Sequence, residues 1–590
     1  MHVVATAGHV DHGKSTLVLA LTGTDPDRWA EEKARGLTID LGFAHLALPS
    51  GREVALVDVP GHVRFLRNML AGVGAVDAAL FVVAATEGWK PQSEEHLRIL
   101  ELLGISRAVV AITKVGIVDD DTRTLVEMEL EERVAASSLA GAEVVAVDAP
   151  GGIGIDHLRG ALDRLVATTP PAADRERPRL WVDRSFVARG SGTVVTGTLT
   201  GGTLAVDDDL EVVGPGPAAA RRGRLRVRGL QTHGHARPAV GPGERVALNV
   251  TGAAHEDLVR GDALVRPGQW HVTRRVDVSL QVLDSLDHAV SRRGAYQLYA
   301  GSGEHAVGLR VLGPSEIAAG ACGTARLHLP AGLALLPGDR FVLRESGRDE
   351  TVGGGEMLDV DPVLPAARAR PSRSPDRVVA ERGWVDVADL ERLTGERRSA
   401  DVAGRWVVDP AWLTRERGAL AATVTAAGPL GVDVAALGSR DRALVGDLDG
   451  VVVRAGRAVR AAGAVDGHLG AAAAGVPWVD ELRSHPWTAP DPAAAGVGRD
   501  LLRELVRDGA VVERDGAWFA AETITRAAGE VARLLAASPD GITVGALRDA
   551  LGASRKHTIP LLAHMDANGM TRRRGDRRIA GPRLPASSGP

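Results

Sequence analysis

An eight-residue stretch near the start of the chain, GHVDHGKS, has the spacing of a phosphate-binding loop. Its glycines let backbone N–H groups approach phosphate oxygens closely, and the start of the following helix favours an anion. Lys14 would reach the β and γ phosphates of a nucleoside triphosphate, and the Ser15 hydroxyl would bind Mg2+. The residues expected to line this part of a nucleotide site are Gly8, Asp11, His12, Gly13, Lys14, Ser15 and Thr16.

Two other segments carry groups that hydrolysis of a triphosphate needs. Asp58 stands at the end of an apolar run, where its carboxylate would join Ser15 around Mg2+. The Gly61 amide would bind the γ phosphate, and His62 is placed to orient an attacking water. Thr38 would supply a second hydroxyl to the metal. The alternative for His62 is a surface histidine on a turn.

The elements that position these residues alternate between two types from residue 1 to about 170. Apolar strand-like runs such as EVALVDVPG and AALFVVAA are followed by helical stretches, for example at 92–103 and 124–136. This alternation predicts a parallel sheet covered by helices. A proline-rich, polar segment follows at Thr168–Pro178, so we expect the first domain to span residues 1–172.

The apolar period changes to two between about residues 180 and 362, as in the run VDVSLQV at 276–282. Alternation of this kind, with glycine-rich turns between the runs, predicts antiparallel strands. We expect two β-barrels, one over 173–268 and one over 269–365.

Helical periods return after a second proline-rich linker at Ala366–Asp376. In RDLLRELVRDGAVVERDGAWFA a helix precedes a strand, a tight turn and a strand, which is the arrangement of a winged helix. We expect tandem winged-helix domains over 376–590, the last at about 523–583. The predicted fold is multidomain, with an α/β phosphate-loop domain, two antiparallel β-barrels and a C-terminal α+β winged-helix array.

The bulk composition excludes some functions. The 590 residues carry a formal net charge of −5, so no overall charge attracts the chain to nucleic acid. No apolar run approaches the roughly 20 residues of a membrane span, and the first residues lack the apolar core of a signal peptide. We expect no membrane contact, a cytoplasmic location and a monomer. Cys322 is the single cysteine, which excludes an intrachain disulfide, and we expect it to be buried.

Any polyanion site must therefore be local, and the stretch MTRRRGDRRIAG is the strongest candidate. Eight lysines and arginines lie between Ser554 and Arg583, against two acidic residues. They would bind a phosphate backbone from the third helix and the wing of the last domain. The residues are Arg555, Lys556, Arg572, Arg573, Arg574, Arg577 and Arg578. A solvated charged hairpin is the alternative, and winged helices often read DNA rather than RNA.

The segments at 8–16, 35–38 and 58–62 resemble those of the translational GTPases, the family of elongation factor Tu. The resemblance extends over the two barrels. It implies GTP as the nucleotide and Mg2+ as the cofactor. It also implies hydrolysis as a release switch, in which His62 acts once the ribosome positions it.

One position departs from this family. The family reads guanine with Asn or Thr, then Lys, any residue and Asp, whereas this chain has Thr113, Lys114, Val115 and Gly116. The missing carboxylate would accept charge-assisted bonds from guanine, each worth roughly 1.5 to 3 kcal/mol. We therefore expect GTP to bind less selectively than usual.

Two other sets of residues could contact the base. A shifted loop could bring a carboxylate from residues 119–121, which are all aspartate. In VDAP, Asp148 stands where the family usually has serine, and the Ala149 amide could still bond the base oxygen. The residues expected on the base side of the site are Thr113, Lys114, Asp148 and Ala149.

The stretches at 181–202 and 243–252 resemble the second domain of the selenocysteine-specific elongation factors, the SelB family. The resemblance implies an amino acid pocket of Asp183, Arg184 and Arg245, with Asp183 orienting Arg184. A selenol is more acidic than a thiol, whose pKa is about 8.5, so selenocysteine is an anion near neutral pH. Two arginines would favour it over serine and cysteine. The alternative is a set of ordinary ion pairs at the barrel rim.

Residues 553–578 resemble the last winged-helix domain of the same family, which grips an mRNA hairpin beside a recoded stop codon. The resemblance implies a GTPase that carries selenocysteinyl-tRNA to the ribosome at a UGA codon marked by the hairpin. Two alternatives stay open. One is a general aminoacyl- or initiator-tRNA GTPase with an unrelated nucleic-acid-binding tail. The other is a nucleic-acid-binding regulator with a vestigial nucleotide domain.

Overall fold

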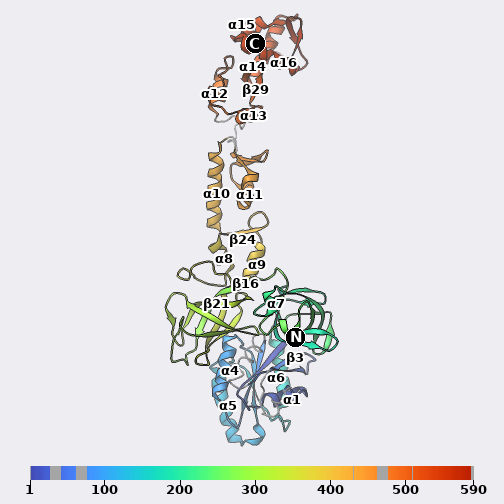
Figure 1. The fold of residues 1–590 in the computed structure, drawn as a ribbon, viewed down its shortest axis with the longest axis vertical. Coiled ribbons are helices and arrows are strands. Elements are labelled where there is room, and N and C mark those ends of the chain that lie inside the picture. The colour runs from blue at the N-terminus through green and yellow to red at the C-terminus, as the bar shows by residue number, and fades with distance from the viewer. Residues whose placement is uncertain are drawn as a thin grey trace. The chain divides into compact units, whose positions relative to one another are not determined.

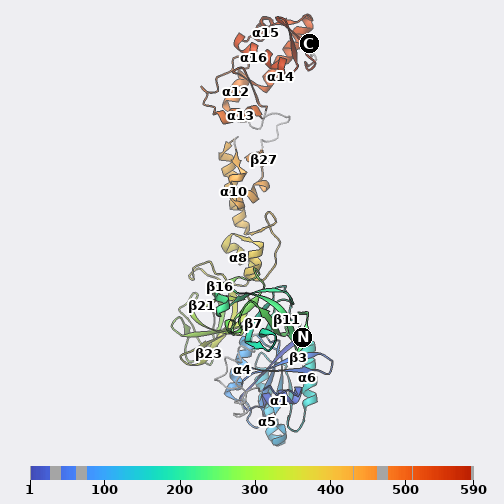
Figure 2. The same ribbon diagram turned by 45° about the vertical axis from the view of Figure 1, so that its right-hand side comes forward.

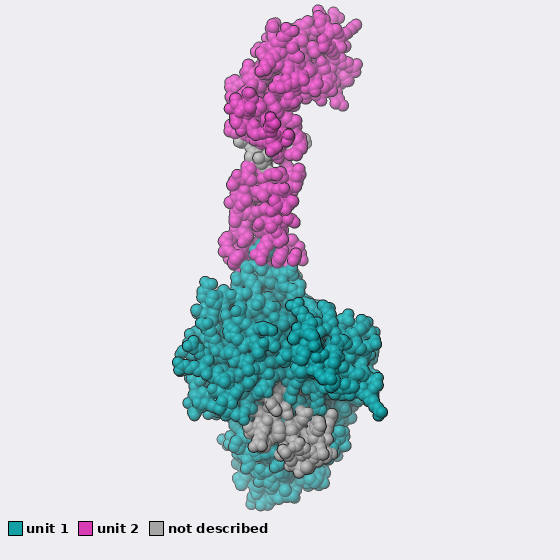
Figure 3. All heavy atoms as spheres, viewed as in Figure 1, with its two compact units in different colours: residues 1–399 teal, residues 400–590 magenta. Residues whose placement is uncertain are grey.

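The computed structural model describes residues 2–26, 41–60, 76–428, 431–460, 476–507 and 509–585. The chain divides into two compact units, residues 1–399 and 400–590 (Figure 3). The first unit contains an α/β domain, two β-barrels and two short helices, and the second contains helices and hairpins (Figures 1 and 2). No helix in the described part of the chain has the length and apolarity needed to span a membrane.

The first domain is a six-stranded sheet with helices on both faces (Figure 1). The strand order is β2-β3-β1-β4-β5-β6, and only β2 runs antiparallel to its neighbour. Helices α1 and α6 cover one face, and α4 and α5 cover the other. The elements are β1 (His2–Ala7), α1 (Lys14–Thr22), β2 (Gly42–Ala47), β3 (Glu53–Asp58), β4 (Ala78–Ala84), α4 (Pro91–Leu102), β5 (Ala108–Thr113), α5 (Asp120–Ala135), β6 (Glu143–Ala146) and α6 (Ile155–Thr168). Because both faces are covered, β4 is buried along its whole length, and the predicted α/β class is confirmed.

The second domain closes six strands into a barrel. Its ring runs β10-β15-β7-β8-β14-β11, and the pairing of β10 with β11 closes it. The strands are β7 (Arg179–Ala188), β8 (Gly192–Thr200), β10 (Asp209–Val213), β11 (Arg224–Thr232), β14 (Arg245–Thr251) and β15 (Ala263–Val265), with β12 (His235–Arg237) at the edge. Strand β7 contains a bulge between Val182 and Arg184.

The third domain is a second closed barrel, in the order β16-β21-β19-β18-β22-β23. Its strands are β16 (Val272–Val282), β18 (Tyr296–Ala300), β19 (Gly303–Val311), β21 (Cys322–Ala334), β22 (Arg340–Glu345) and β23 (Glu350–Asp359). The alternating apolar residues at 276–282 point inward and are buried, as the sequence predicts. The expectation for Cys322 is wrong: it is exposed, because it begins β21 at the end of the barrel wall.

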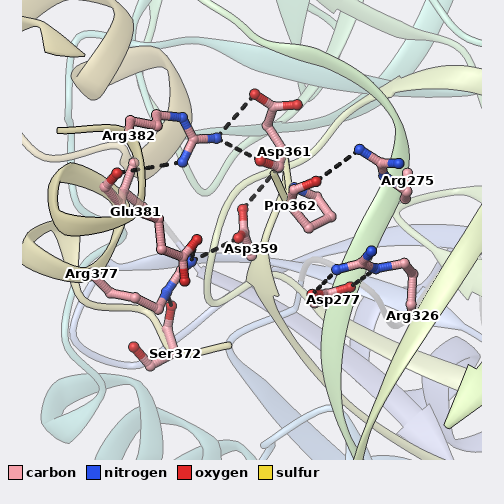
Figure 4. Close-up of polar contacts among 11 residues, drawn as sticks. Arg275, Asp277, Arg326, Asp359, Asp361, Pro362, Ser372, Arg377, Glu381 and Arg382 are labelled. Atoms are coloured by element: carbon pink, nitrogen blue, oxygen red, sulfur yellow. Dashed lines mark hydrogen bonds and ion pairs between the residues drawn. The ribbon is translucent and has the colours of Figure 1, made fainter. Parts of the chain in front are cut away.

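A network of ion pairs holds α8 (Pro375–Arg382) on the third barrel (Figure 4). Arg377 pairs with Asp359 at 2.8 Å, and Arg382 pairs with Asp361 at 3.0 Å. Inside the barrel wall, Arg326 on β21 donates two bonds to a β16 carboxylate, at 2.6 and 2.9 Å. Helix α8 and the following α9 (Val387–Thr394) thus belong to the first unit, although the sequence pattern places the boundary at 366–376.

The second unit consists of helices followed by short hairpins. Before the last domain, its elements include α10 (Pro410–Ala426), α11 (Ser439–Leu444), β27 (Val451–Arg454), β28 (Arg457–Arg460), α12 (Pro477–Ser484), α13 (Arg499–Arg507), β29 (Val511–Arg514) and β30 (Ala517–Ala520). The last domain contains α14 (Ala521–Ala537), β31 (Ile542–Thr543), α15 (Val544–Leu551), α16 (Arg555–Ala567), β32 (Thr571–Arg574) and β33 (Arg577–Ala580). Three helices and a hairpin give this domain the predicted winged-helix fold.

Candidate functional site

The phosphate loop leaves β1 at Gly8 and enters α1 at Lys14. Gly8 has φ 135°, and a Cβ there would lie 2.1 Å from the carbonyl oxygen of Val82, so only glycine fits. The Gly8 amide donates to Nδ1 of His96 at 2.9 Å, and the Val10 amide donates to the Gln92 side chain at 3.1 Å. Side chains of helix α4 therefore fix the backbone of the loop through these two hydrogen bonds.

Lys14 is buried under this loop. Its ammonium donates to the carbonyl oxygens of Gly8 at 3.0 Å and His9 at 2.7 Å. Burial lowers its pKa to about 8, against the opposing attraction of Asp58 and Asp11. Among the residues that the structure describes, this buried ammonium bonds carbonyl oxygens, and it is suited to an anionic ligand such as a phosphate.

The candidate metal residues meet at the end of β3. Oγ of Ser15 donates to Oδ2 of Asp58 at 2.7 Å, and the Thr6 hydroxyl donates to Oδ1 at 2.8 Å. The same Thr6 oxygen accepts the Val59 amide at 3.0 Å. The hydroxyl and carboxylate oxygens fit Mg2+, which takes one or two protein oxygens and leaves its other positions to phosphates and waters. Sequence reasoning missed Thr6, because β1 is buried almost throughout and no pattern distinguishes this threonine from a core residue.

Two buried histidines support the loop. Burial lowers the pKa values of His12 and His96 to about 3, so both are neutral at physiological pH. Nδ1 of His12 lies 3.3 Å from the Val82 carbonyl oxygen. Neutral rings hold the loop without adding positive charge beneath it. His12 was predicted from the motif, whereas His96 carries no motif signal and could be found only through the fold.

On the base side, two loops leave the same edge of the sheet. Strands β5 and β6 run parallel with Ile112 opposite Ala146, so the segments after them emerge side by side. Thr113 donates to the carbonyl oxygen of His12 at 2.7 Å, which joins this edge to the phosphate loop. Lys114 follows with φ 59°. The predicted residues Thr113, Lys114, Asp148 and Ala149 thus gather at the edge where α/β sheets bind ligands.

Three predicted residues lie outside the described part of the chain. Thr38, Gly61 and His62 fall within 27–40 and 61–75, so their roles stay predictions.

The predicted amino acid pocket lies where the first two domains meet. Nη2 of Arg245 donates to both oxygens of Asp183, at 2.9 and 3.0 Å. Asp183 therefore orients Arg245. The resemblance implies that Asp183 orients Arg184, but Arg184 donates to the Leu41 carbonyl oxygen at 2.6 Å. Asp183 is the extra residue of the β7 bulge, because Val182 and Arg184 pair with the adjacent residues Gly197 and Thr196.

An aromatic ring from the first domain covers both arginines. The guanidinium carbon of Arg245 lies 3.5 Å from the centroid of the Phe43 ring, and that of Arg184 lies 5.2 Å from it. Thr196 on β8 accepts a bond from Arg245 at 3.1 Å. Sequence reasoning missed Phe43 and Thr196, which come from other strands. The set contains two arginine side chains and one aspartate side chain, a formal charge of +1 for these three residues.

The basic residues of the last domain occupy two elements. Arg555 and Lys556 begin α16 and are exposed. Arg572, Arg573, Arg574 and Arg577 are exposed on the β32–β33 hairpin. Arg578 is a correction to the predicted surface, because it is buried and pairs with Asp566 at 3.3 Å.

Strand pairing sorts the hairpin arginines by face. Arg574 pairs with Arg577 across the hairpin, and Arg572 pairs with Ile579. Directly paired residues share a face and alternate positions share it too, so Arg572, Arg574 and Arg577 lie on one face. Arg573 and Arg578 lie on the other, which carries the buried Thr571.

Two family models match the chain. The first domain matches the elongation factor Tu GTP-binding domain over residues 1–168. Residues 533–580 match the model described as elongation factor SelB, winged helix.

Individual proteins of the same families are similar to this chain. A selenocysteine-specific elongation factor of Desulfomicrobium baculatum is 39% identical over 357 residues, which are 60% of this chain and 55% of that protein. Elongation factor Tu 2 of Streptomyces avermitilis is 33% identical over 388 residues, which are 61% of this chain and 96% of that protein. The crystal structure of a bacterial selenocysteine-specific elongation factor, EF-Sec, has a TM-score of 0.69 at 25% identity, over 98% of this chain and 99% of that one.

The matches to curated selenocysteine-specific factors span less than two thirds of those proteins. Elongation factor Tu 2, in contrast, is matched over nearly its whole length, and the phosphate loop and both barrels lie within the first unit. The tail adds the match to the SelB winged helix. The chain is also similar to selenocysteine-specific elongation factors over part of their length, and it belongs to the translational GTPases of the elongation factor Tu superfamily.

Proposed function

We propose that this chain binds GTP and selenocysteinyl-tRNA and delivers the tRNA to ribosomes at a UGA codon marked by an mRNA hairpin. GTP hydrolysis would drive release of the tRNA. The observation that carries the proposal is the pocket of Asp183, Arg184 and Arg245, in which two guanidinium groups lie over one Phe43 ring and suit an anionic amino acid. The protein would act in the cytoplasm, as a monomer.

The nucleotide would be held mainly by the phosphate loop. Lys14 is already positioned under the loop carbonyls, and backbone amides at the start of α1 would bind phosphate oxygens. Mg2+ would be held by Ser15, Asp58 and Thr38, and would neutralise charge on the β and γ phosphates. Gly61 would bind the γ phosphate through its amide, and His62 would orient the attacking water when the ribosome contacts the protein.

Charge would provide discrimination in the amino acid pocket. A selenolate carries a full negative charge near neutral pH, whereas a serine hydroxyl does not and a thiol with a pKa of about 8.5 mostly does not. The Phe43 ring excludes water from one face of Arg245, and reduced hydration strengthens its attraction to an anion. Thr196 and Asp183 fix the guanidinium in place, so little reorganisation is needed on binding.

The basic hairpin would bind the mRNA. Its exposed arginines would contact the phosphate backbone and set the affinity, and a tether of this kind raises the local concentration of the carrier at one codon.

Competition between two charged tRNAs tests the proposal. In the presence of a non-hydrolysable GTP analogue, selenocysteinyl-tRNA is expected to bind at least tenfold more tightly than seryl-tRNA on the same tRNA body, about 1.4 kcal/mol. Equal affinities would favour the general tRNA GTPase instead.

The Arg245→Ala variant tests the pocket itself. It removes a charge that lies within the pocket and should weaken selenocysteinyl-tRNA by about tenfold or more, while seryl-tRNA changes little. Arg226→Ala is the matched control, because Arg226 is half exposed on the same barrel and pairs with Asp207 at the surface. Equal losses for both tRNAs with Arg245→Ala would count against the pocket.

A further inference from the structure

Gly116 provides no side chain at the end of the nucleotide site where the base would bind. The family pattern has a carboxylate at this position, and this chain has none there. A Cβ on Gly116 would lie 3.0 Å from both the carboxyl carbon and Oδ2 of Asp148. The carboxylate that is missing from the loop after β5 is thus replaced in space by one from the loop after β6.

Asp148 is held firmly in this place. Its backbone forms a two-way bridge with Ile153, with both N···O distances at 3.0 Å. Oδ2 accepts the Gly151 amide at 3.0 Å, which fixes the orientation of the carboxylate. The other oxygen, Oδ1, has no hydrogen-bond partner among the residues that the structure describes, so it can accept from a ligand.

The glycines on either side of Asp148 make room for its carboxylate. A Cβ on Gly151 would lie 2.6 Å from Oδ2, and one on Gly116 would be tighter than an ordinary contact. The two loops are also joined directly, because the Val115 amide lies 3.4 Å from the Val147 carbonyl oxygen. The loops after β5 and β6 therefore pack together so that the glycine at position 116 makes room for the Asp148 carboxylate.

The neighbouring aspartates have a different role. Asp119 caps α5 by accepting the Thr122 amide at 2.7 Å, and residues 120 and 121 form the exposed first turn of that helix. Bringing one of them to the base would break the cap.

We propose that Asp148 is the carboxylate that reads guanine in this protein, in place of the one absent at position 116. The inference rests on the proposed GTP binding and deepens it. Guanine presents two donors on one edge, N1–H and the C2 amino group, which a carboxylate can accept together. Adenine has an acceptor at N1, and xanthine has a carbonyl at C2, so neither matches an anion at this point.

Asp148→Asn in the full chain tests this assignment. An asparagine keeps the oxygen that accepts the Gly151 amide but adds a donor that suits the C2 carbonyl of xanthine. Displacement of a fluorescent GDP by GDP, xanthosine diphosphate and ADP gives the affinities. We expect Asp148→Asn to weaken GDP by about tenfold to a hundredfold and to make xanthosine diphosphate the better ligand. Asp119→Asn is the matched control, since asparagine also caps helices, and its selectivity should equal that of the unchanged protein.

A reciprocal exchange provides the second test. Gly116→Asp alone should weaken GDP, because it crowds Asp148 with a like charge. Gly116→Asp combined with Asp148→Ser restores the family arrangement and should return GDP affinity to within a few fold of the unchanged protein. A folded double variant without recovered affinity would overturn the proposal.

The outcomes separate this inference from the proposed function. If the unchanged protein prefers GDP and Asp148→Asn keeps that preference, the assignment of Asp148 is wrong while GTP binding stands. If the unchanged protein binds no guanine nucleotide, the proposed function itself fails, and the assignment fails with it.

Discussion

Burial of the Lys14 ammonium, which favours phosphate binding, lowers the stability of the nucleotide-free protein. Its pKa falls from 10.5 to about 8 on burial, so the folded chain binds fewer protons than the unfolded chain between these pH values. Its burial therefore destabilises the folded state fully below about pH 8, and the penalty fades as the pH rises toward 10.5. At 1.36 kcal/mol per pKa unit, the penalty is about 3 kcal/mol.

Replacing Lys14 with methionine should reveal this penalty. At pH 7 the nucleotide-free Lys14→Met variant is expected to gain up to about 3 kcal/mol in the free energy of unfolding of the first domain, and to lose at least a hundredfold in GTP affinity. Calorimetric unfolding at pH 7 and at pH 10 measures the gain, which should shrink at the higher pH. A variant less stable than the unchanged protein at pH 7 would contradict this account.

Thr6→Val should loosen the end of β3. The change keeps the shape of the side chain but leaves the buried Val59 amide and one oxygen of Asp58 without their partner, at a cost of about 1 to 3 kcal/mol. Thermal unfolding and GDP affinity should both fall. Thr22→Val is the control, because the half-buried Thr22 hydroxyl bonds residues close to it in the chain: it donates to the Val18 carbonyl oxygen at 2.7 Å and accepts the Thr24 amide at 3.1 Å.

The sequence predicts the residues of the site that motifs encode, and not those that only packing brings in. The phosphate loop and Asp58 follow from local spacing, whereas Asp183, Arg184 and Arg245 follow from the resemblance to the SelB family. His96 and Phe43 reach the site from a helix and a strand distant in the chain, and no local pattern marks them. Likewise, five arginines within residues 572–578 suggest one surface, yet one of them, Arg578, is buried and pairs with Asp566.

At the scale of elements, the strand pairing of the last hairpin predicts which of its arginines contact RNA and which stabilise the domain. Glutamine at Arg572, Arg574 or Arg577 should weaken RNA binding about uniformly across sequences. Each change should also reduce the slope of log affinity against log salt by about 0.7 to 0.9. Fluorescence anisotropy of a labelled host mRNA hairpin over a salt series measures both.

Arg578→Gln serves as the contrast within the same hairpin. It should lower the unfolding temperature of the last domain, because Asp566 loses its buried partner, and should leave the salt slope nearly unchanged. The same slope change for Arg578 and Arg574 would show that the two faces are not distinct.

Element types are predicted well because their periods differ. Covered parallel strands read as continuous apolar runs, and barrel strands alternate, as at 276–282. The bulge in β7 is not predictable in this way, because it inserts one residue without changing composition.

At the scale of the whole molecule, removing the last domain should leave the binding of GTP and tRNA intact but abolish the selection of one codon. A chain ending after residue 520 is expected to keep its affinities for GTP and selenocysteinyl-tRNA within about threefold, since the nucleotide site and pocket lie in the first unit. It should lose most selenocysteine insertion at a hairpin-marked UGA codon, because the tether no longer raises local concentration. Reconstituted translation with and without the hairpin measures this loss, and undiminished insertion would contradict the tether.

The docking of α8 determines where this chain tolerates being cut. The proline-rich stretch at 366–376 looks from the sequence like the domain boundary at which the chain could be cleaved. Cleavage and separation there would remove Arg377 and Arg382, and with them the counter-charges of two carboxylates at the end of β23. The barrel would then keep two carboxylates without these arginines, whereas a cut after Ser399 would leave both ion pairs in place.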